Sequence, residues 1–157
     1  MTIAIREPRD ADFFPWLSLY EAYAAQRGVE LTETKALLLW TWLSDPANAE
    51  RAFIVVSDSG DVTGLVHFHT FPRPLEGDTG VFIDAFHLAP ETDDPQAGSA
   101  LFDAVRDDAA THGSSVLRWT QAEGEQLPAV LSQVGGTPTQ PRTFELQAAV
   151  QPAAQLV

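Results

Sequence analysis

Residues 80–102, GVFIDAFHLAPETDDPQAGSALF, join a strand-like segment to a helix-like one and decide the fold. Their first half, up to Pro90, is apolar and rich in aromatic and β-branched residues, which predicts a strand. From Pro95 to His112 the apolar residues recur at helical spacing, which predicts a helix. The next apolar stretch, SSVLRWTQ at 114–121, predicts a second strand, so this region is expected to form a β-α-β unit.

Toward the N-terminus, the sequence predicts further strands and helices separated by turn residues. Thr32 is a favourable N-cap for a helix that Pro46 ends, and Asp10 or Asp12 can cap the helix before it. The turn signal SDSGD stands between two strand-like runs. The predicted elements are a strand over 2–8, helices over 13–28 and 33–45, and strands over 51–58 and 62–71.

Toward the C-terminus, the sequence predicts a short helix over 125–136 and a closing strand over 142–150. The order of elements is then β-α-α-β-β-β-α-β-α-β. A hairpin-rich first half followed by a β-α-β unit predicts an α/β fold, a mixed sheet with helices on both faces. We expect one domain over residues 1–147 and a loosely ordered tail over 148–157.

Composition narrows the classes of function. The 157-residue chain has no cysteine, which excludes thiol catalysis, disulfides and cysteine-ligated metal and fits a reducing cytoplasm. Its formal net charge of −13 opposes binding to nucleic acid and to anionic membranes, so neither is expected as a partner. The same charge favours a cationic partner such as an amine, although an acidic surface can also serve solubility alone. The N-terminus lacks the features of a signal peptide, so a cytoplasmic location is expected.

Several short strings, in this order, resemble the GCN5-related N-acetyltransferase (GNAT) superfamily. IREPRDAD (5–12) resembles the family's opening strand and helix, and GDVTGLVHFH (60–69) its central hairpin. FHLAP (86–90) is similar to the end of its fourth strand. LRWTQ (117–121) and VGG (134–136) stand where the family has its fifth strand and the glycine after its last helix. The resemblance covers about residues 2–147 and implies a GNAT-like acyl-CoA N-acyltransferase fold.

The resemblance also implies acetyl-CoA as the cofactor, held where the fourth and fifth strands separate and at the start of the next helix. That helix start offers free N–H groups and a favourable dipole to the pyrophosphate. The residues at these positions are Leu88, Ala89, Gln96, Ala97, Gly98, Ser99 and Ala100.

The pyrophosphate loop departs from the family pattern, Arg/Gln-x-x-Gly-x-Gly/Ala. DDPQAG (93–98) places Asp93 at the first position and Gln96 at the first glycine, and keeps only Gly98. An aspartate about 5 Å from a phosphate charge opposes binding by roughly 1–3 kcal/mol. Asp94 and Pro95 are favourable N-cap and N1 residues, so the helix start is already capped from within. The sequence thus predicts a degenerate phosphate loop.

The last predicted helix departs from its family pattern as well. The family has Asn-x-x-Ala-x-x-Leu-Tyr there, whereas this chain has Gly124, Leu127 and Leu131 at the Asn, Ala and Tyr positions. The tyrosine that the family uses to protonate the departing CoA thiolate is therefore absent. General acid assistance of this kind contributes about 10²–10⁴ in rate, and a thiolate can leave without it.

Asp84 is the first candidate catalytic residue. It interrupts an apolar strand, and we expect its side chain on the same face as Phe82 and Phe86. The resemblance implies a catalytic carboxylate on this strand, where it would take a proton from the acceptor amine. A substrate-binding or structural aspartate, paired with Arg118 or a backbone group, is the alternative.

His67 and His69 are the other catalytic candidates. They are two residues apart on a predicted strand, so their side chains should share one face with Leu65 and Phe71. His87 on the next strand could complete a substrate-facing cluster. Histidines packed beneath a helix are the alternative, and no metal site is expected because local spacing fixes no third ligand.

The predicted helix over 13–28 carries Tyr20 and Tyr23, which the resemblance places near the acceptor pocket as substrate-binding residues. Tyr20 also fits the helix's core-facing side. Trp40 and Trp42 are two apart on the next helix and must face different ways, so one is expected in the core and the other at a pocket or dimer contact.

Two functions are compatible with these observations. The first is an N-acetyltransferase that moves an acetyl group from acetyl-CoA to a small amine, with a cationic acceptor favoured by the acidic surface. The second is a GNAT-fold binding or dimerisation module that no longer uses acetyl-CoA, which the altered phosphate loop and missing tyrosine favour. A homodimer remains open under either function.

Overall fold

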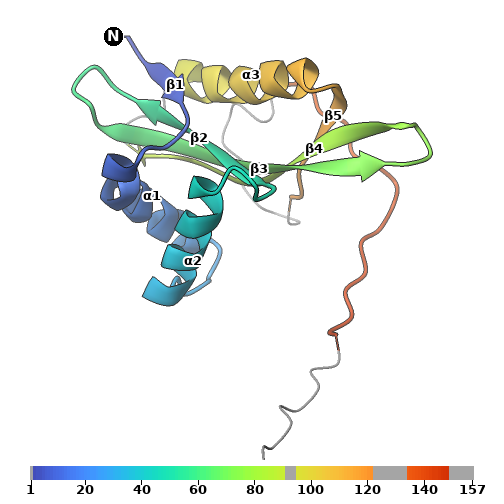
Figure 1. Cartoon of the computed structure of the whole chain (residues 1–157), viewed down its shortest axis with the longest axis horizontal. Helices are drawn as coiled ribbons and strands as arrows, with labels where there is room; N and C mark the ends of the chain where they lie inside the picture. Colours follow the sequence, from blue (N-terminus) through green and yellow to red (C-terminus); the bar gives the residue numbers. More distant parts are fainter. Residues whose placement is uncertain (1, 91–94, 122–133, 149–157) are drawn as a thin grey trace, which may run out of the picture.

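The computed structural model describes residues 2–90, 95–121 and 134–148 (Figure 1). One five-stranded sheet, in the order β1-β2-β3-β4-β5, forms its centre. The β1–β2, β2–β3 and β3–β4 pairs are antiparallel and the β4–β5 pair is parallel. The elements are β1 (Ala4–Arg6), a 3₁₀ turn (Asp10–Asp12), α1 (Phe13–Gln26), α2 (Glu33–Ser44), β2 (Glu50–Val56), β3 (Val62–Arg73), β4 (Asp78–Leu88), α3 (Pro95–Thr111) and β5 (Ser114–Arg118).

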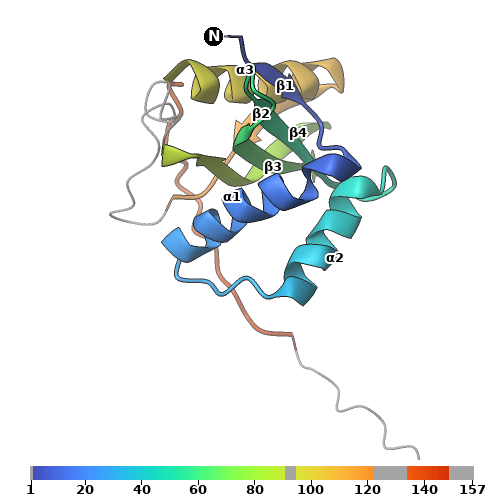
Figure 2. The ribbon, with the colours of Figure 1, turned by 90° about the vertical axis from the view of Figure 1, so that its left-hand side faces the viewer.

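Helices cover both faces of the sheet, as predicted. Figures 1 and 2 show α3 along one face and the pair α1 and α2 along the other. Each face has its own buried core: Leu101 and Val105 of α3 pack on Phe68 of β3, and Trp16 of α1 packs on Leu65 on the opposite side. No helix in the described ranges is both long and apolar enough to cross a membrane.

The predicted N-cap is present at the start of α2 and absent at the start of α1. The Thr32 hydroxyl accepts a hydrogen bond from the Lys35 backbone N–H at 3.3 Å, which confirms the predicted cap of α2. Asp12 makes no such cap to α1. Its carboxylate instead accepts hydrogen bonds from the Arg6 guanidinium and the Arg9 backbone N–H, which tie β1 to the 3₁₀ turn before α1.

The parallel strands β4 and β5 separate partway along β4. They pair only from Thr79 to Phe82 on β4 and from Ser114 to Arg118 on β5, although β4 continues to Leu88. Beyond Phe82, the edge of β4 on the β5 side has no strand partner within the described ranges. The backbone N–H and C=O groups of that edge therefore take no hydrogen bonds from a neighbouring strand of the described residues.

β4 also contains a β-bulge at Asp84. In the β3–β4 pairing, His67 lies opposite Ala85 and the next residue, Phe68, lies opposite Ile83, so Asp84 has no partner on β3. An extra residue of this kind bends the strand and re-aims its side chains. The bulge therefore lies next to the point where β4 and β5 separate.

The bulge changes which side chains share a face with Asp84. Phe82 lies beside His69, with 5.7 Å between the ring centroids, and Asp84 bonds to the same histidine. Phe86 belongs to the core beneath α3. The expectation that Asp84 shares a face with both phenylalanines is therefore wrong for Phe86, because the bulge reverses the alternation between the two positions.

The last two predicted elements have different outcomes. The helix predicted over 125–136, with Gly124, Leu127 and Leu131, lies almost entirely outside the described residues. The strand predicted over 142–150 is wrong for its described part, since 142–148 contain no strand. Phe144 and Leu146 are largely exposed there, so the alternating pattern that predicted a strand does not bury its apolar side chains.

Candidate active site

Three adjacent strands bring Glu50, His69 and Asp84 together, and we call these residues the acid–histidine cluster. His69 of β3 lies directly opposite Glu50 of β2. The His69 Nδ1 atom is 2.6 Å from Oδ2 of Asp84 and 3.7 Å from Oε2 of Glu50. One nitrogen or oxygen atom of each side chain lies within 4.8 Å of the other two. The cluster is thus compact enough to share protons among its members.

The two carboxyl groups of the cluster have unequal surroundings. The Glu50 side chain is 17% exposed and that of Asp84 is 35% exposed. Burial, followed by the negative charge of Asp84 and a hydrogen bond with it, raises the pKa of Glu50 to about 8. Near neutral pH the Glu50 carboxyl is therefore mostly protonated, and the Asp84 side chain is the more exposed of the two.

Two tyrosines of α1 lie against the cluster. The Tyr23 hydroxyl donates a hydrogen bond to the backbone carbonyl of Asp84 at 3.1 Å, which supports the bulge. Tyr20 stacks on Tyr23 with 5.8 Å between the ring centroids. Burial, then the nearby Tyr23, Glu50 and Asp84, raise the pKa of Tyr20, so its hydroxyl stays protonated.

His67 lies on the same face as His69 but in the core. Its side chain is buried at 1% exposure, and its Nε2 atom accepts a hydrogen bond from Trp16 Nε1 at 2.9 Å. Burial lowers the pKa of His67 to about 3, so this imidazole is neutral. The structure places the His67 side chain beneath α1, as expected for a histidine packed under a helix. A catalytic role for His67 stays a prediction.

His87 is also buried on the α1 side, with 6.3 Å between its ring centroid and that of Tyr23. Burial lowers its pKa, and its Nε2 atom has no hydrogen-bond partner in the described residues. The structure brings only His69 of the three histidines into contact with Asp84. Next to Asp84 the structure thus has one histidine between two carboxyl groups, and a substrate-facing role for His87 stays a prediction.

The sequence analysis did not identify Glu50. This residue stands just before the strand predicted over 51–58, after the polar loop that follows α2. The spacing of Glu50 from Ala52 and Ile54 could have indicated its position, because alternate residues of a strand share a face. Ile54 is fully buried beneath α1, so Glu50 lies on the same face. A carboxylate whose position along the strand places it on a buried face is a candidate for a perturbed pKa.

The residues expected to hold a cofactor lie where β4 ends and α3 begins. Leu88 is half-buried and Ala89 is buried, with its N–H donating to the Thr63 carbonyl at 2.9 Å. The start of α3 has small residues after the exposed Gln96: Ala97 and Gly98 are buried, and Ser99 and Ala100 are half-buried. Asp93 and Asp94, on which the degenerate phosphate loop depends, lie outside the described residues.

Trp40 and Trp42 face different ways, as predicted. Trp40 packs against Phe13 and Trp16 in the core between α1 and α2, and Trp42 is 42% exposed. Trp119 lies edge-on to Phe102 of α3, with 5.6 Å between the ring centroids.

Comparison with solved structures places this arrangement in a known fold, although no protein-family model and no curated protein sequence matches the chain. Ribosomal-protein-alanine N-acetyltransferase from Brucella melitensis biovar Abortus 2308 is 18% identical, with a TM-score of 0.75 over 94% of this chain and 100% of its own. A GNAT family acetyltransferase from Staphylococcus aureus is 14% identical, with a TM-score of 0.70 over 93% and 100%.

A further solved structure has a ligand built on CoA. AAC(6')-Iy in complex with the bisubstrate analogue CoA-S-monomethyl-acetylneamine is 14% identical, with a TM-score of 0.79 over 95% of this chain and 100% of its own. Identities this low show the fold and leave the reaction open. The chain has the fold of the GCN5-related N-acetyltransferase superfamily, as its sequence predicts.

Proposed function

We propose that this protein is an N-acetyltransferase that transfers an acetyl group from acetyl-CoA to a small-molecule amine. The observation that carries the proposal is the position of the acid–histidine cluster. Its accepting carboxylate, Asp84, lies on the bulge of β4, two residues beyond the last pairing with β5. Proton-accepting groups thus adjoin a stretch of the β4 edge that has no strand partner among the described residues.

The residues around this opening fit an acyl-CoA thioester. The unpaired edge of β4 would offer backbone groups to an amide-containing chain, and the small residues 97–100 would let a pyrophosphate approach the N–H groups at the start of α3. Leu88, Ala89 and residues 96–100 would hold the cofactor. When bound, a thioester supplies an electrophilic acyl carbon with a thiolate leaving group.

The cluster would prepare the acceptor by removing its proton. An amine is protonated near neutral pH and attacks only after it loses a proton from nitrogen. The Asp84 carboxylate would accept that proton, directly or through water, while His69 Nδ1 holds the carboxylate in place. The neighbouring Glu50, whose pKa is raised to about 8, would strengthen Asp84 as a proton acceptor when it ionises.

The pH dependence of the rate tests this assignment. The rate of acetyl transfer to benzylamine, at saturating acetyl-CoA, is expected to rise with pH up to about 8, because ionisation of Glu50 places a second negative charge beside Asp84 and makes Asp84 a stronger proton acceptor. In Glu50→Gln the amide does not ionise, so the rise near pH 8 should disappear. Release of CoA thiol can be followed with a thiol reagent without background, since the chain has no cysteine.

Two controls separate the proposal from its alternatives. Glu76→Gln changes a half-exposed glutamate in the β3–β4 turn and should keep the wild-type pH profile. EDTA should leave the rate unchanged, because the proposal uses no metal ion. A pH profile of the rate that is the same in Glu50→Gln as in the wild type would show that the base is not in the acid–histidine cluster. Failure to acetylate any amine at any pH would contradict the proposed function.

A further inference from the structure

Helix α2 is apolar on almost every side, although the rest of the fold covers only one of them. Between Lys35 and Asp45, the residue that ends the helix, the sequence ALLLWTWLS has no charged residue. The covered side packs against the core beneath α1 through Leu39, Trp40 and Leu43. A helix that is apolar all round is usually buried all round. The uncovered side of α2 is therefore expected to meet another surface.

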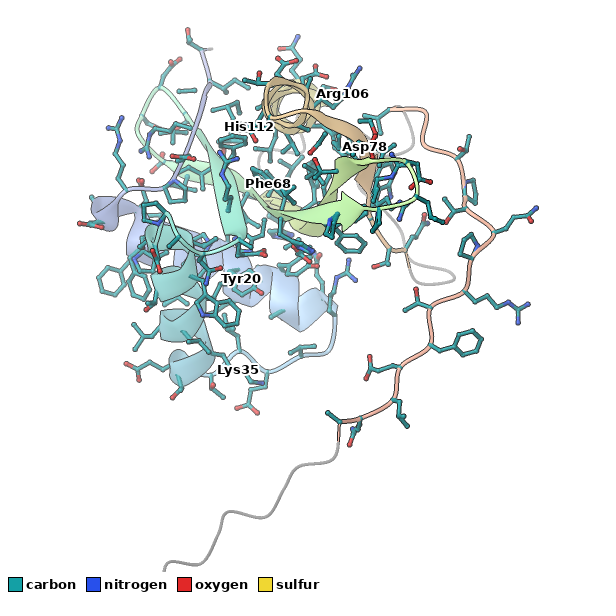
Figure 3. All side chains as sticks on the ribbon, turned by 45° about the vertical axis from the view of Figure 1, so that its right-hand side comes forward. Tyr20, Lys35, Phe68, Asp78, Arg106 and His112 are labelled. Atoms are coloured by element: carbon teal, nitrogen blue, oxygen red, sulfur yellow. The ribbon has the colours of Figure 1, made fainter. Side chains whose placement is uncertain are left out.

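The uncovered side carries a straight stripe of four residues. Positions i, i+3, i+7 and i+10 of this stripe, which lie on one face of a helix, are Lys35, Leu38, Trp42 and Asp45. Leu38 is 50% exposed and Trp42 is 42% exposed, and the charged residues at both ends are exposed as well. Figure 3 shows Lys35 at the outer end of the helix pair, away from the sheet. This α2 stripe is thus apolar in its middle, positive at its start and negative at its end.

The order of charges makes the α2 stripe complementary to a second copy of itself. When two α2 helices lie antiparallel and cross level with position 40, Lys35 meets Asp45 of the partner subunit and Leu38 meets Trp42 of the partner subunit. The two-fold axis repeats each contact, so the apolar pairs lie between two ion pairs. Each lysine then also lies at the negative end of the partner helix. A parallel arrangement would place Lys35 against the partner's Lys35.

A pocket beside the α2 stripe offers a place for the larger apolar side chain. It has a volume of about 340 Å³, lies between α1 and α2, and has Leu38 in its wall together with Tyr20 and Tyr23. In the antiparallel arrangement, the indole ring of the partner subunit's Trp42 lies next to Leu38 and can pack into this pocket. Tryptophan side chains that fill such pockets contribute strongly to the stability of protein interfaces.

We propose that α2 is a homodimer interface, in which the α2 stripes of two copies of this chain pack antiparallel. The contact extends over ten residues of each helix, about 15 Å at a rise of 1.5 Å per residue. An interface this short belongs to the weak and reversible class, so we expect a dimer Kd in the micromolar range. No residue of the stripe belongs to the acid–histidine cluster, so the inference does not depend on the proposed function.

Sedimentation velocity of the full chain tests the association. The wild type is expected to shift from monomer to dimer between about 1 µM and about 300 µM. Leu38→Glu should raise the dimer Kd at least about a hundredfold, because each dimer loses two apolar contacts and buries two charges. The matched control is Leu37→Glu, which changes a leucine of similar exposure on the same helix outside the stripe and should keep the wild-type Kd. A monomer at every concentration, or equal Kd values for the two variants, would overturn the proposal.

Charge reversal tests the orientation and changes only exposed residues. Lys35→Glu and Asp45→Lys each place two like-charge pairs in the antiparallel dimer, so each should raise the Kd about tenfold. Both substitutions in one chain restore the opposite charges and should restore the wild-type Kd. If net charge alone governed association, Asp45→Lys would tighten the dimer of this acidic chain. That result, or no recovery in the double variant, would overturn the antiparallel contact.

Discussion

Asp84→Asn is expected to lower the rate of acetyl transfer by about 10²–10⁴-fold, the usual contribution of a general base. The amide keeps the shape of the side chain and can still bond His69 Nδ1, but it cannot accept a proton from the acceptor. The loss should appear in kcat as well as in kcat/KM, since the proton is removed during the chemical step. Steady-state kinetics with acetyl-CoA and benzylamine measure both values.

The matched control is Asp103→Asn, which removes an exposed carboxylate of α3 on the opposite face of the sheet. It should retain wild-type rates. Thermal unfolding of Asp84→Asn should show a folded protein, because the Asp84 side chain is partly exposed and asparagine keeps its shape. A folded Asp84→Asn variant with wild-type kcat would exclude this residue as the base.

Acidification from pH 6.5 to pH 4 is expected to lower the free energy of unfolding by about 3 kcal/mol through His67 alone. The pKa of this buried imidazole is about 3 in the folded protein, well below its ordinary value of 6.5. Between these values the unfolded chain binds the proton and the folded chain does not. The stability that the neutral histidine contributes is therefore complete above pH 6.5 and is lost as the pH falls.

His67→Gln should flatten this dependence, because glutamine can accept the Trp16 hydrogen bond through its carbonyl but does not titrate. Urea unfolding at several pH values between 4 and 7 measures the slope. His112→Gln, which replaces an exposed histidine at the end of α3, should keep the wild-type slope. Equal slopes for wild type and His67→Gln would show that His67 is protonated in the folded state.

The sequence predicts the order of the main elements because their signals are local. The apolar run before Pro90, the helical spacing after Pro95 and the Thr32 cap each depend on a few neighbouring residues. The strand predicted over 142–150 fails within 142–148 for a related reason. Alternation of apolar and polar residues indicates a strand only where a partner edge covers the apolar side chains, and Phe144 and Leu146 have no such cover in the described structure.

The site was only partly predictable because it depends on pairing between distant strands. Asp84 and His69 stand out as polar residues in apolar strands, and the structure joins them at 2.6 Å. The bulge that aims Asp84 depends on its register with β3, which no local pattern of β4 encodes. Glu50 enters the cluster through its pairing with His69, and its raised pKa follows from burial that the sequence does not show.

The most direct test of the central claim, that the opening between β4 and β5 serves acetyl transfer, is a calorimetric titration of the full chain with acetyl-CoA. It should be run at low and at physiological salt, because the acidic surface opposes a polyanion most strongly when screening is weak. We expect saturable binding with a micromolar Kd at physiological salt. Absence of binding up to millimolar acetyl-CoA in both conditions would contradict it and favour a GNAT-fold binding module.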